Sequence, residues 1–176
     1  MTPAEWKAAL LKIEPKGKPW IIDGFADALP ELCEKYEINT PVRQQHFIAQ
    51  CAHESDHFQT TQEYASGAAY EGRKDLGNTH KGDGKRFRGH GLIQLTGRAN
   101  HAAASEALDH DFVANPEDAA IFPWAGEIAG WYWHTHELNR HADRDDMRAA
   151  TKAINGGLSG LRDRTAYLDQ AKRALA

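Results

Sequence analysis

The distribution of glycine divides this chain into helical parts and one irregular segment. Between Ser66 and Gly97, glycine occupies eight positions: 67, 72, 77, 82, 84, 89, 91 and 97. Glycine favours tight turns over long helices, because without a Cβ it adopts backbone angles that are closed to other residues. Within this segment, residues 86–88 and 92–96 are predicted to form short strands around Gly89–Gly91.

Apolar residues recur at helical spacing through most of the remaining chain. The segments with this pattern are 3–12, 20–36, 41–57, 98–108, 121–133, 145–154 and 161–175. Pro30 is predicted to kink or divide the second of them, and Asn115-Pro116 is predicted to begin a further helix. The aromatic residues at 124, 131, 132 and 133 are expected in the core. The pattern predicts one mainly α domain over residues 1–176, with a small irregular β lobe inserted at about 63–97.

Composition and charge exclude several classes of protein. A chain of 176 residues is large enough to bury a core without disulfides, and its two cysteines, Cys33 and Cys51, are expected to be free. A net charge of −4 gives no reason to expect a nucleic-acid partner. The first residues show no signal-peptide pattern and no apolar run has membrane-spanning length. We therefore expect synthesis in a cytoplasm and no stable membrane insertion.

The segment 41–57 places an acid inside an apolar helical stripe. Thr40 is a favourable N-cap, and Phe47, Cys51, Glu54 and Phe58 fall within about 60° of one another around a helix. Burial favours the neutral carboxyl, so the pKa of Glu54 is expected to rise, as suits a general acid. The alternative is a glutamate at the edge of the core, with its carboxylate in water or bonded to an arginine.

Two chemistries fit the residues around Glu54. His53-Glu54-Ser55-Asp56-His57 matches H-E-x-x-H, in which two histidines one helical turn apart bind zinc. Catalytic zinc needs a third protein ligand, and no histidine follows at the spacing of that motif. Alternatively, Glu54 pairs with Glu63, nine residues later. An inverting glycosidase uses two such carboxyls about 6.5–9.5 Å apart, one protonating the leaving oxygen and one activating water.

Several further motifs give the chain a resemblance to glycoside hydrolase family 19, which includes chitinases and phage endolysins. The residues that carry it are His53-Glu54-Ser55, Glu63, Gly77-Asn78-Thr79, Gly82-Asp83-Gly84, the run 86–100 (RFRGHGLIQLTGRAN) and Ile154-Asn155-Gly156-Gly157. The resemblance covers roughly residues 40–170 and implies a lysozyme-like, α-rich fold. In that fold a catalytic cleft separates a helical body from a small β-containing lobe. Single-domain length and short loops resemble the endolysin branch of the family.

The resemblance also implies roles for individual residues. Glu54 matches the general acid, Glu63 the general base, and Thr96 the residue that helps to hold the attacking water. The positions that match substrate-binding or cleft-organising residues are His53, Tyr64, Arg88, Gln94, Asn100 and Asn155. The chain departs from the family at His90, where arginine is commoner, and at His101, where tyrosine is usual. Glu71 is a rival for the second carboxylate, with an ion pair to Arg73 or Arg88 as its structural alternative.

The resemblance implies a monomeric endolysin that cleaves the β-1,4 glycan strands of bacterial peptidoglycan without a metal or organic cofactor. Such an enzyme is made in the host cytoplasm and reaches the wall after release, through a holin. The alternatives are a chitinase of the same family, a zinc metallopeptidase using His53-Glu54-x-x-His57, and a non-catalytic wall-binding homologue. Residues 73–98 carry seven Arg or Lys against two Asp, a local charge of +5 that suits an anionic polymer.

Overall fold

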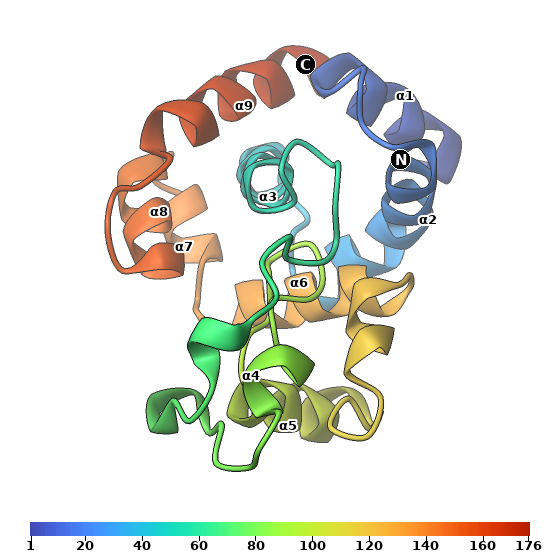
Figure 1. Cartoon of the computed structure of the whole chain (residues 1–176). Coiled ribbons are helices and arrows are strands. Elements are labelled where there is room, and N and C mark those ends of the chain that lie inside the picture. Colours follow the sequence, from blue (N-terminus) through green and yellow to red (C-terminus); the bar gives the residue numbers. More distant parts are fainter.

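The computed structural model describes residues 1–176, and it is a bundle of helices wrapped around one central helix (Figure 1). The α-helices are α1 (Pro3–Ile13), α2 (Pro19–Lys35), α3 (Pro41–Glu54), α4 (Asp83–Arg86), α5 (Arg98–Leu108), α6 (Trp124–Thr135), α7 (Asn139–Ala142), α8 (Met147–Asn155) and α9 (Leu161–Ala174). The 3₁₀ helices are η1 (Ala68–Tyr70), η2 (Lys74–Leu76) and η3 (Pro116–Ala120). The mainly α class predicted from the sequence is confirmed.

Helix α3 forms the centre of the body. It is seen end-on in Figure 1, with α9, α1, α2 and α6 around it, and its most extensive contacts are with α9. Thr40 caps its start as predicted, accepting a hydrogen bond from the backbone N–H of Arg43. Phe47, Ile48 and Cys51 are fully buried in the main core. A helix so enclosed presents its C-terminal residue, Glu54, at a fixed place.

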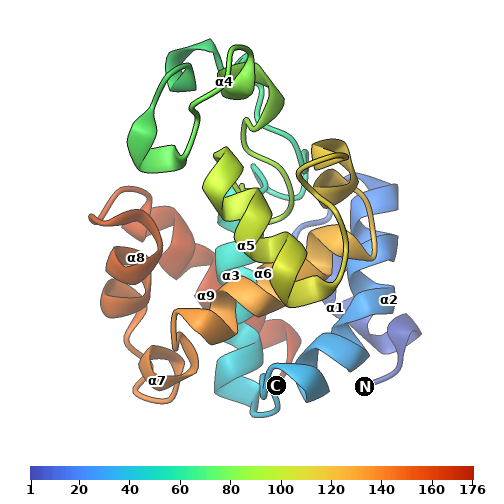
Figure 2. The same ribbon diagram turned by 90° about the horizontal axis from the view of Figure 1, so that it is seen from below.

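The second lobe contains the glycine-rich segment, and it lies beside the body in Figure 2. Its elements are short: η1, η2, α4 and the connecting turns precede α5. Arg98, at the start of α5, donates two hydrogen bonds to the buried Asp83 carboxylate, at 2.9 and 2.6 Å. Asn78 accepts from the Arg98 backbone N–H and donates to Tyr70 O. These bonds fix a lobe that has little apolar core of its own.

The predicted strands at 86–88 and 92–96 do not form. The only β pairing consists of isolated bridges from His90 to Gln62 and to Leu95, and residues 83–86 form α4 instead. Gly91, at φ +86°, and Gln94, at φ +53°, turn the chain too tightly for a ladder. The β part of the predicted lobe is therefore limited to these bridges.

Some helix boundaries differ from the predicted ones. Helix α2 continues through Pro30, because buried apolar residues before and after it, such as Phe25 and Leu32, hold both halves against the core. Helix α3 ends at Glu54 rather than at 57. Asn115-Pro116 begins a 3₁₀ helix rather than an α-helix, and the short α7 was not predicted. No helix has both the length and the apolar character needed to cross a membrane.

Candidate active site

A cleft of about 360 Å³ lies at the end of α3, where the body meets the second lobe. It is lined by residues from α3, η2, α5, α6 and α8 and from the turn before α5. Five of the predicted site residues line it together: Glu54, Gln94, Thr96, Asn100 and Asn155. Residues far apart in the sequence thus meet at one hollow.

Glu54 is held in this cleft by an arginine that the sequence did not point to. Arg164, from α9, is almost fully buried, and its Nη2 donates to Glu54 Oε1 at 2.5 Å. Its Nη1 donates to Gln50 Oε1, one helical turn earlier on α3. Glu54 Oε2 takes part in no hydrogen bond of the protein and stays free in the cleft. The guanidinium of Arg164 is a favourable partner for the Glu54 carboxylate.

The residues of the turn before α5 hold one another in place. Thr96 Oγ1 donates to Gln94 O at 3.0 Å, and Asn100 Nδ2 donates to Thr96 O at 2.7 Å. Gln94 has a left-handed backbone and its Nε2 donates to Gly91 O at 3.2 Å. The Thr96 hydroxyl donates its hydrogen bond to a carbonyl. Its oxygen can therefore still accept a hydrogen bond from a water in the cleft.

Two of the aromatic residues expected in the core line the cleft instead. Trp131 and Tyr132 are only partly buried and face Glu54 from α6, whereas Trp133, on the same helix, is fully buried. Tyr132 donates to Ile154 O at 3.3 Å and stacks on His136 at a centroid distance of 3.8 Å. Burial, and next the negative charge of Glu54, raise the pKa of Tyr132. Aromatic faces at a cleft wall suit the apolar faces of sugar rings.

Glu63 lies beside the cleft rather than among its lining residues. Its Oε1 accepts from the Tyr70 hydroxyl at 2.8 Å and its Oε2 from the Gly89 backbone N–H at 3.0 Å. A Cβ added at Gly89 would lie 2.5 Å from Gln94 Oε1 and 3.3 Å from Glu63 Cβ. Glycine at 89 therefore lets Glu63 approach Gln94, which does line the cleft.

Glu71 has a structural role within the second lobe. Its two carboxylate oxygens accept from the backbone N–H groups of Gly82 and Gly84, at 2.7 and 2.8 Å. These bonds lower its pKa. The expected ion pair with Arg73 or Arg88 is wrong, since Arg73 pairs with Asp75. Glu71 is thus committed to holding the loop that leads into α4.

The histidines of the H-E-x-x-H match do not share a helix face. His57 follows the end of α3 in a left-handed conformation, with φ +63°. His53 Nδ1 bonds Asp163 on α9 at 2.6 Å, and its ring packs so closely on Gly160 that any Cβ there would lie 2.3 Å from it. No group of three potential metal ligands converges in the structure. The helical geometry on which the zinc interpretation depended is therefore absent.

Two other predicted binding residues lie outside the cleft. Tyr64 is 73% exposed, and its hydroxyl donates to Asp56 at 2.8 Å. Arg88 lines a separate pocket together with His90. Neither residue touches the hollow that contains Glu54.

The comparisons with known proteins bear on the family and on the fold. No family model matches the chain. A glycosyl hydrolase family 19 domain-containing protein from Haemophilus influenzae is 32% identical over 83% of this chain and 86% of its own. The chain belongs to glycoside hydrolase family 19. It is therefore a glycosidase of the chitinase type, and the family resemblance seen in the sequence is confirmed.

Other similar proteins match over less of their length or at lower identity. An acidic endochitinase from Beta vulgaris is 38% identical over 43% of this chain, which spans only 26% of that protein. The structure of chitinase C from Streptomyces griseus has a TM-score of 0.74 at 20% identity, over 96% of this chain and 75% of that one. A class IV chitinase from Zea mays has a TM-score of 0.68 at 20% identity, over 93% and 84% of the two chains. These structures support the fold.

Proposed function

We propose that this family 19 enzyme is an endolysin that hydrolyses the β-1,4 glycan strands of bacterial peptidoglycan with inversion. The observation that supports a glycosidase at this place is the cleft itself, where the end of α3 presents Glu54 among Thr96, Asn100 and Asn155. The basic stretch of residues 73–98 favours the endolysin over its relatives. In this proposal the enzyme acts as a monomer, without metal or cofactor, and reaches the wall from the host cytoplasm through a holin.

Glu54 acts as the general acid in this proposal. Arg164 fixes one carboxyl oxygen, so the other, Oε2, is the atom that can carry a proton to the glycosidic oxygen. As the C–O bond breaks, the carboxylate that forms is stabilised by the same guanidinium. The arginine would thus favour proton transfer at the moment when the leaving group needs it.

Glu63 acts as the general base, with Thr96 helping to position the water. The Glu63 carboxylate is oriented by Tyr70 and the Gly89 N–H, and each of its oxygens keeps a lone pair for a further bond. An inverting enzyme needs a water between the base and the sugar, which is consistent with a base set back from the cleft wall.

The basic stretch of residues 73–98 supports a negatively charged substrate. Both of its aspartates are paired, Asp75 with Arg73 and Asp83 with Arg98. Lys74 and Lys81 have no acidic partner and stay exposed. Peptidoglycan carries carboxylates on its peptide stems, whereas chitin is neutral, so this surface favours the wall polymer.

The second candidate is a chitinase, favoured by the names of the plant and bacterial relatives. Mass spectrometry of the products separates the two candidates. Purified peptidoglycan and chitin hexamer would be digested in parallel, with a zinc chelator in one arm. We expect soluble muropeptides from the wall, slow cleavage of the hexamer and no effect of the chelator. Fast hexamer cleavage with no muropeptide release would make the enzyme a chitinase.

A further inference from the structure

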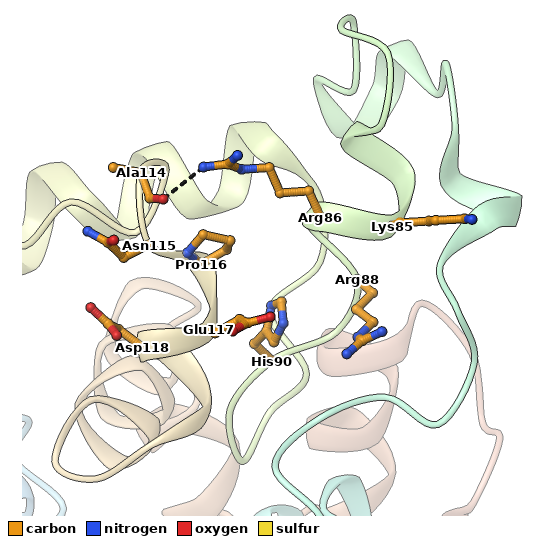
Figure 3. A pocket seen from close by; sticks show the side chains of 9 residues that line it. All are labelled: Lys85, Arg86, Arg88, His90, Ala114, Asn115, Pro116, Glu117 and Asp118. Atoms are coloured by element: carbon orange, nitrogen blue, oxygen red, sulfur yellow. Dashed lines mark hydrogen bonds between the residues drawn. The ribbon is translucent and has the colours of Figure 1, made fainter.

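A second pocket is lined by Arg88 and His90, the two residues that flank Gly89, and it is separate from the cleft. It has a volume of about 380 Å³ and shares no lining residue with the cleft that contains Glu54. One wall comes from residues 85–90 and the other from residues 114–118, at the start of η3 (Figure 3). Nearly all of its lining side chains are polar or charged, so the pocket suits a polar ligand.

Three cationic side chains line this pocket, and one of them, Arg88, is partly buried without a partner in the protein. Its side chain is half-buried, and its Nε is buried without a hydrogen-bond acceptor. The neighbouring Arg86 is already engaged, since its Nη2 donates to Val113 O and Ala114 O at 3.0 and 2.7 Å. Lys85 points away from the pocket in Figure 3. A partly desolvated guanidinium without an acceptor favours a ligand that supplies a carboxylate.

His90 gives the pocket a hydrogen-bond acceptor. His101 Nδ1 bonds Gly97 O at 2.9 Å, and a carbonyl only accepts, so Nδ1 is the protonated nitrogen of His101. Its other nitrogen, Nε2, therefore accepts from His90 Nδ1 at 3.2 Å. Burial, with smaller effects from the charges of His101 and Arg88, lowers the pKa of His90 to about 4, so the ring is neutral at neutral pH. His90 Nε2 thus carries a free lone pair, and no group of the protein donates to it.

Glu117 places a carboxylate on the opposite wall. It is exposed and forms no ion pair or hydrogen bond, and it lines the same pocket as His90 (Figure 3). The neighbouring Asp118 is already bonded to His110 Nε2 at 2.8 Å. Glu117 and the His90 lone pair together make a place for a donor group with positive charge, such as an ammonium.

We propose that this pocket binds the zwitterionic end of an amino acid, with its carboxylate on Arg88 and its ammonium between Glu117 and His90. Arg88 and Glu117 line the same pocket without pairing with each other, so a ligand with both charges can satisfy them together. An uncrosslinked peptidoglycan stem presents such a group where its diamino acid is a dicarboxylic acid, at the free end of that residue's side chain. The identification of the stem as the ligand rests on the proposed function, whereas the pocket chemistry does not.

The direct test is calorimetry with free meso-diaminopimelate as the probe. Its bis-N-acetyl derivative has no ammonium group, and 1,5-diaminopentane has no carboxylate. We expect saturable binding of the diaminopimelate and at least tenfold weaker binding of both analogues. Arg88→Gln and Glu117→Gln should each weaken binding at least tenfold, whereas Lys12→Gln, an exposed change on α1, should leave it unchanged. Glu117 is exposed, so its variant tests the pocket even if Arg88→Gln folds poorly.

Other outcomes overturn the proposal. Equal binding of the bis-N-acetyl derivative would make the pocket a simple anion site, and binding unaffected by Glu117→Gln would place the ligand elsewhere. Failure of this inference is distinguishable from failure of the proposed function. An enzyme that releases muropeptides without binding the probe contradicts only the pocket proposal. An enzyme that binds the probe but releases no muropeptides contradicts only the endolysin.

Discussion

Arg164 donates to the carboxylate of Glu54 from 110 residues further along the chain, and this bond joins α9 to the end of α3. Arg164 is 2% exposed, and it has no other carboxylate partner. A buried guanidinium is costly unless it is paired, and a glutamate at a cleft edge is mobile unless something holds it. The pair therefore contributes both to the packing of α9 and to the orientation of the proposed acid.

Arg164→Met should destabilise the protein by about 3 kcal/mol, the lower end of the range for breaking a buried pair, because Glu54 keeps some contact with water. Urea unfolding measures this change. Arg162→Met, an exposed change two residues earlier on α9, should lie within about 0.5 kcal/mol of wild type. The double variant Arg164→Met/Glu54→Gln should lose less stability than the sum of the losses in the two single variants, since no uncompensated carboxylate remains. Full additivity would show that the two side chains are not coupled.

Glu54→Gln should lower glycosidase activity by at least about a hundredfold, because the amide cannot supply the proton. The fold should survive, since glutamine still accepts a hydrogen bond from Arg164. Activity on labelled walls and the far-ultraviolet circular dichroism spectrum are the two measurements. Glu106→Gln, an exposed change on α5, is the matched control and should keep full activity. A folded Glu54→Gln enzyme with nearly normal activity would remove Glu54 from the mechanism.

The helical body was largely predictable from the sequence. The bounds of α5 are those predicted, and α1 extends only one residue beyond its predicted end. Local periodicity and capping decide such helices. The end of α3 was not predictable, because His57 and Phe58 adopt left-handed angles that glycine would have signalled and these residues do not. The strand prediction was wrong because residues 86–96 form tight turns with no extended partner strand.

The site was predictable where motifs carry it and not where it depends on distant packing. Glu54, Thr96 and Asn155 belong to motifs and do meet in one cleft. Arg164 belongs to no motif. The sequence indicated only that Glu54 could bond an arginine, without indicating which one. Trp131 was expected in the core, because periodicity does not distinguish a helix face that packs on the core from one that borders a cleft.

Glu63→Gln should lower activity by about a hundred- to ten-thousandfold, the usual contribution of a positioned base. Glu71→Gln should affect stability instead, because only a carboxylate offers two acceptor oxygens to Gly82 and Gly84. The pKa of Glu71 is lowered in the folded state, so its contribution is present above its unfolded pKa and is lost as the pH falls through the folded one. Activity assays and melting at pH 7 separate the two roles. If Glu71→Gln proves the more damaging to activity, Glu71 is the base.

The buried pair of His90 and His101 should make the protein less stable in mild acid. Burial lowers the pKa of both to about 4 from the usual histidine value of 6.5. Between these values the unfolded chain binds more protons than the folded one, so stability falls as the pH decreases from 6.5 toward 4. The loss is at most about 3 kcal/mol for each histidine. Urea unfolding at pH 7, 5.5 and 4.5 should show a shallower decline for His101→Phe, and an identical decline would contradict this account.

The exposed lysines of the second lobe should make wall binding sensitive to salt, although the whole chain has a charge of −4. Lys74 and Lys81 line neither the cleft that contains Glu54 nor the pocket that contains Arg88. Reversing their charge therefore changes the surface of the lobe and leaves both sites intact. Exposed charges act over about 8 Å at physiological ionic strength, and added salt shortens that range.

The measurement is sedimentation of the protein with purified walls across a salt series. Binding of the wild type to the walls should weaken as salt is added. It should be weaker and less dependent on salt for Lys74→Glu/Lys81→Glu. Turnover of a short neutral chitin oligomer should be retained, because the lysines act on the anionic polymer before catalysis. Identical salt curves for the two proteins would mean that this surface has no part in capturing the wall.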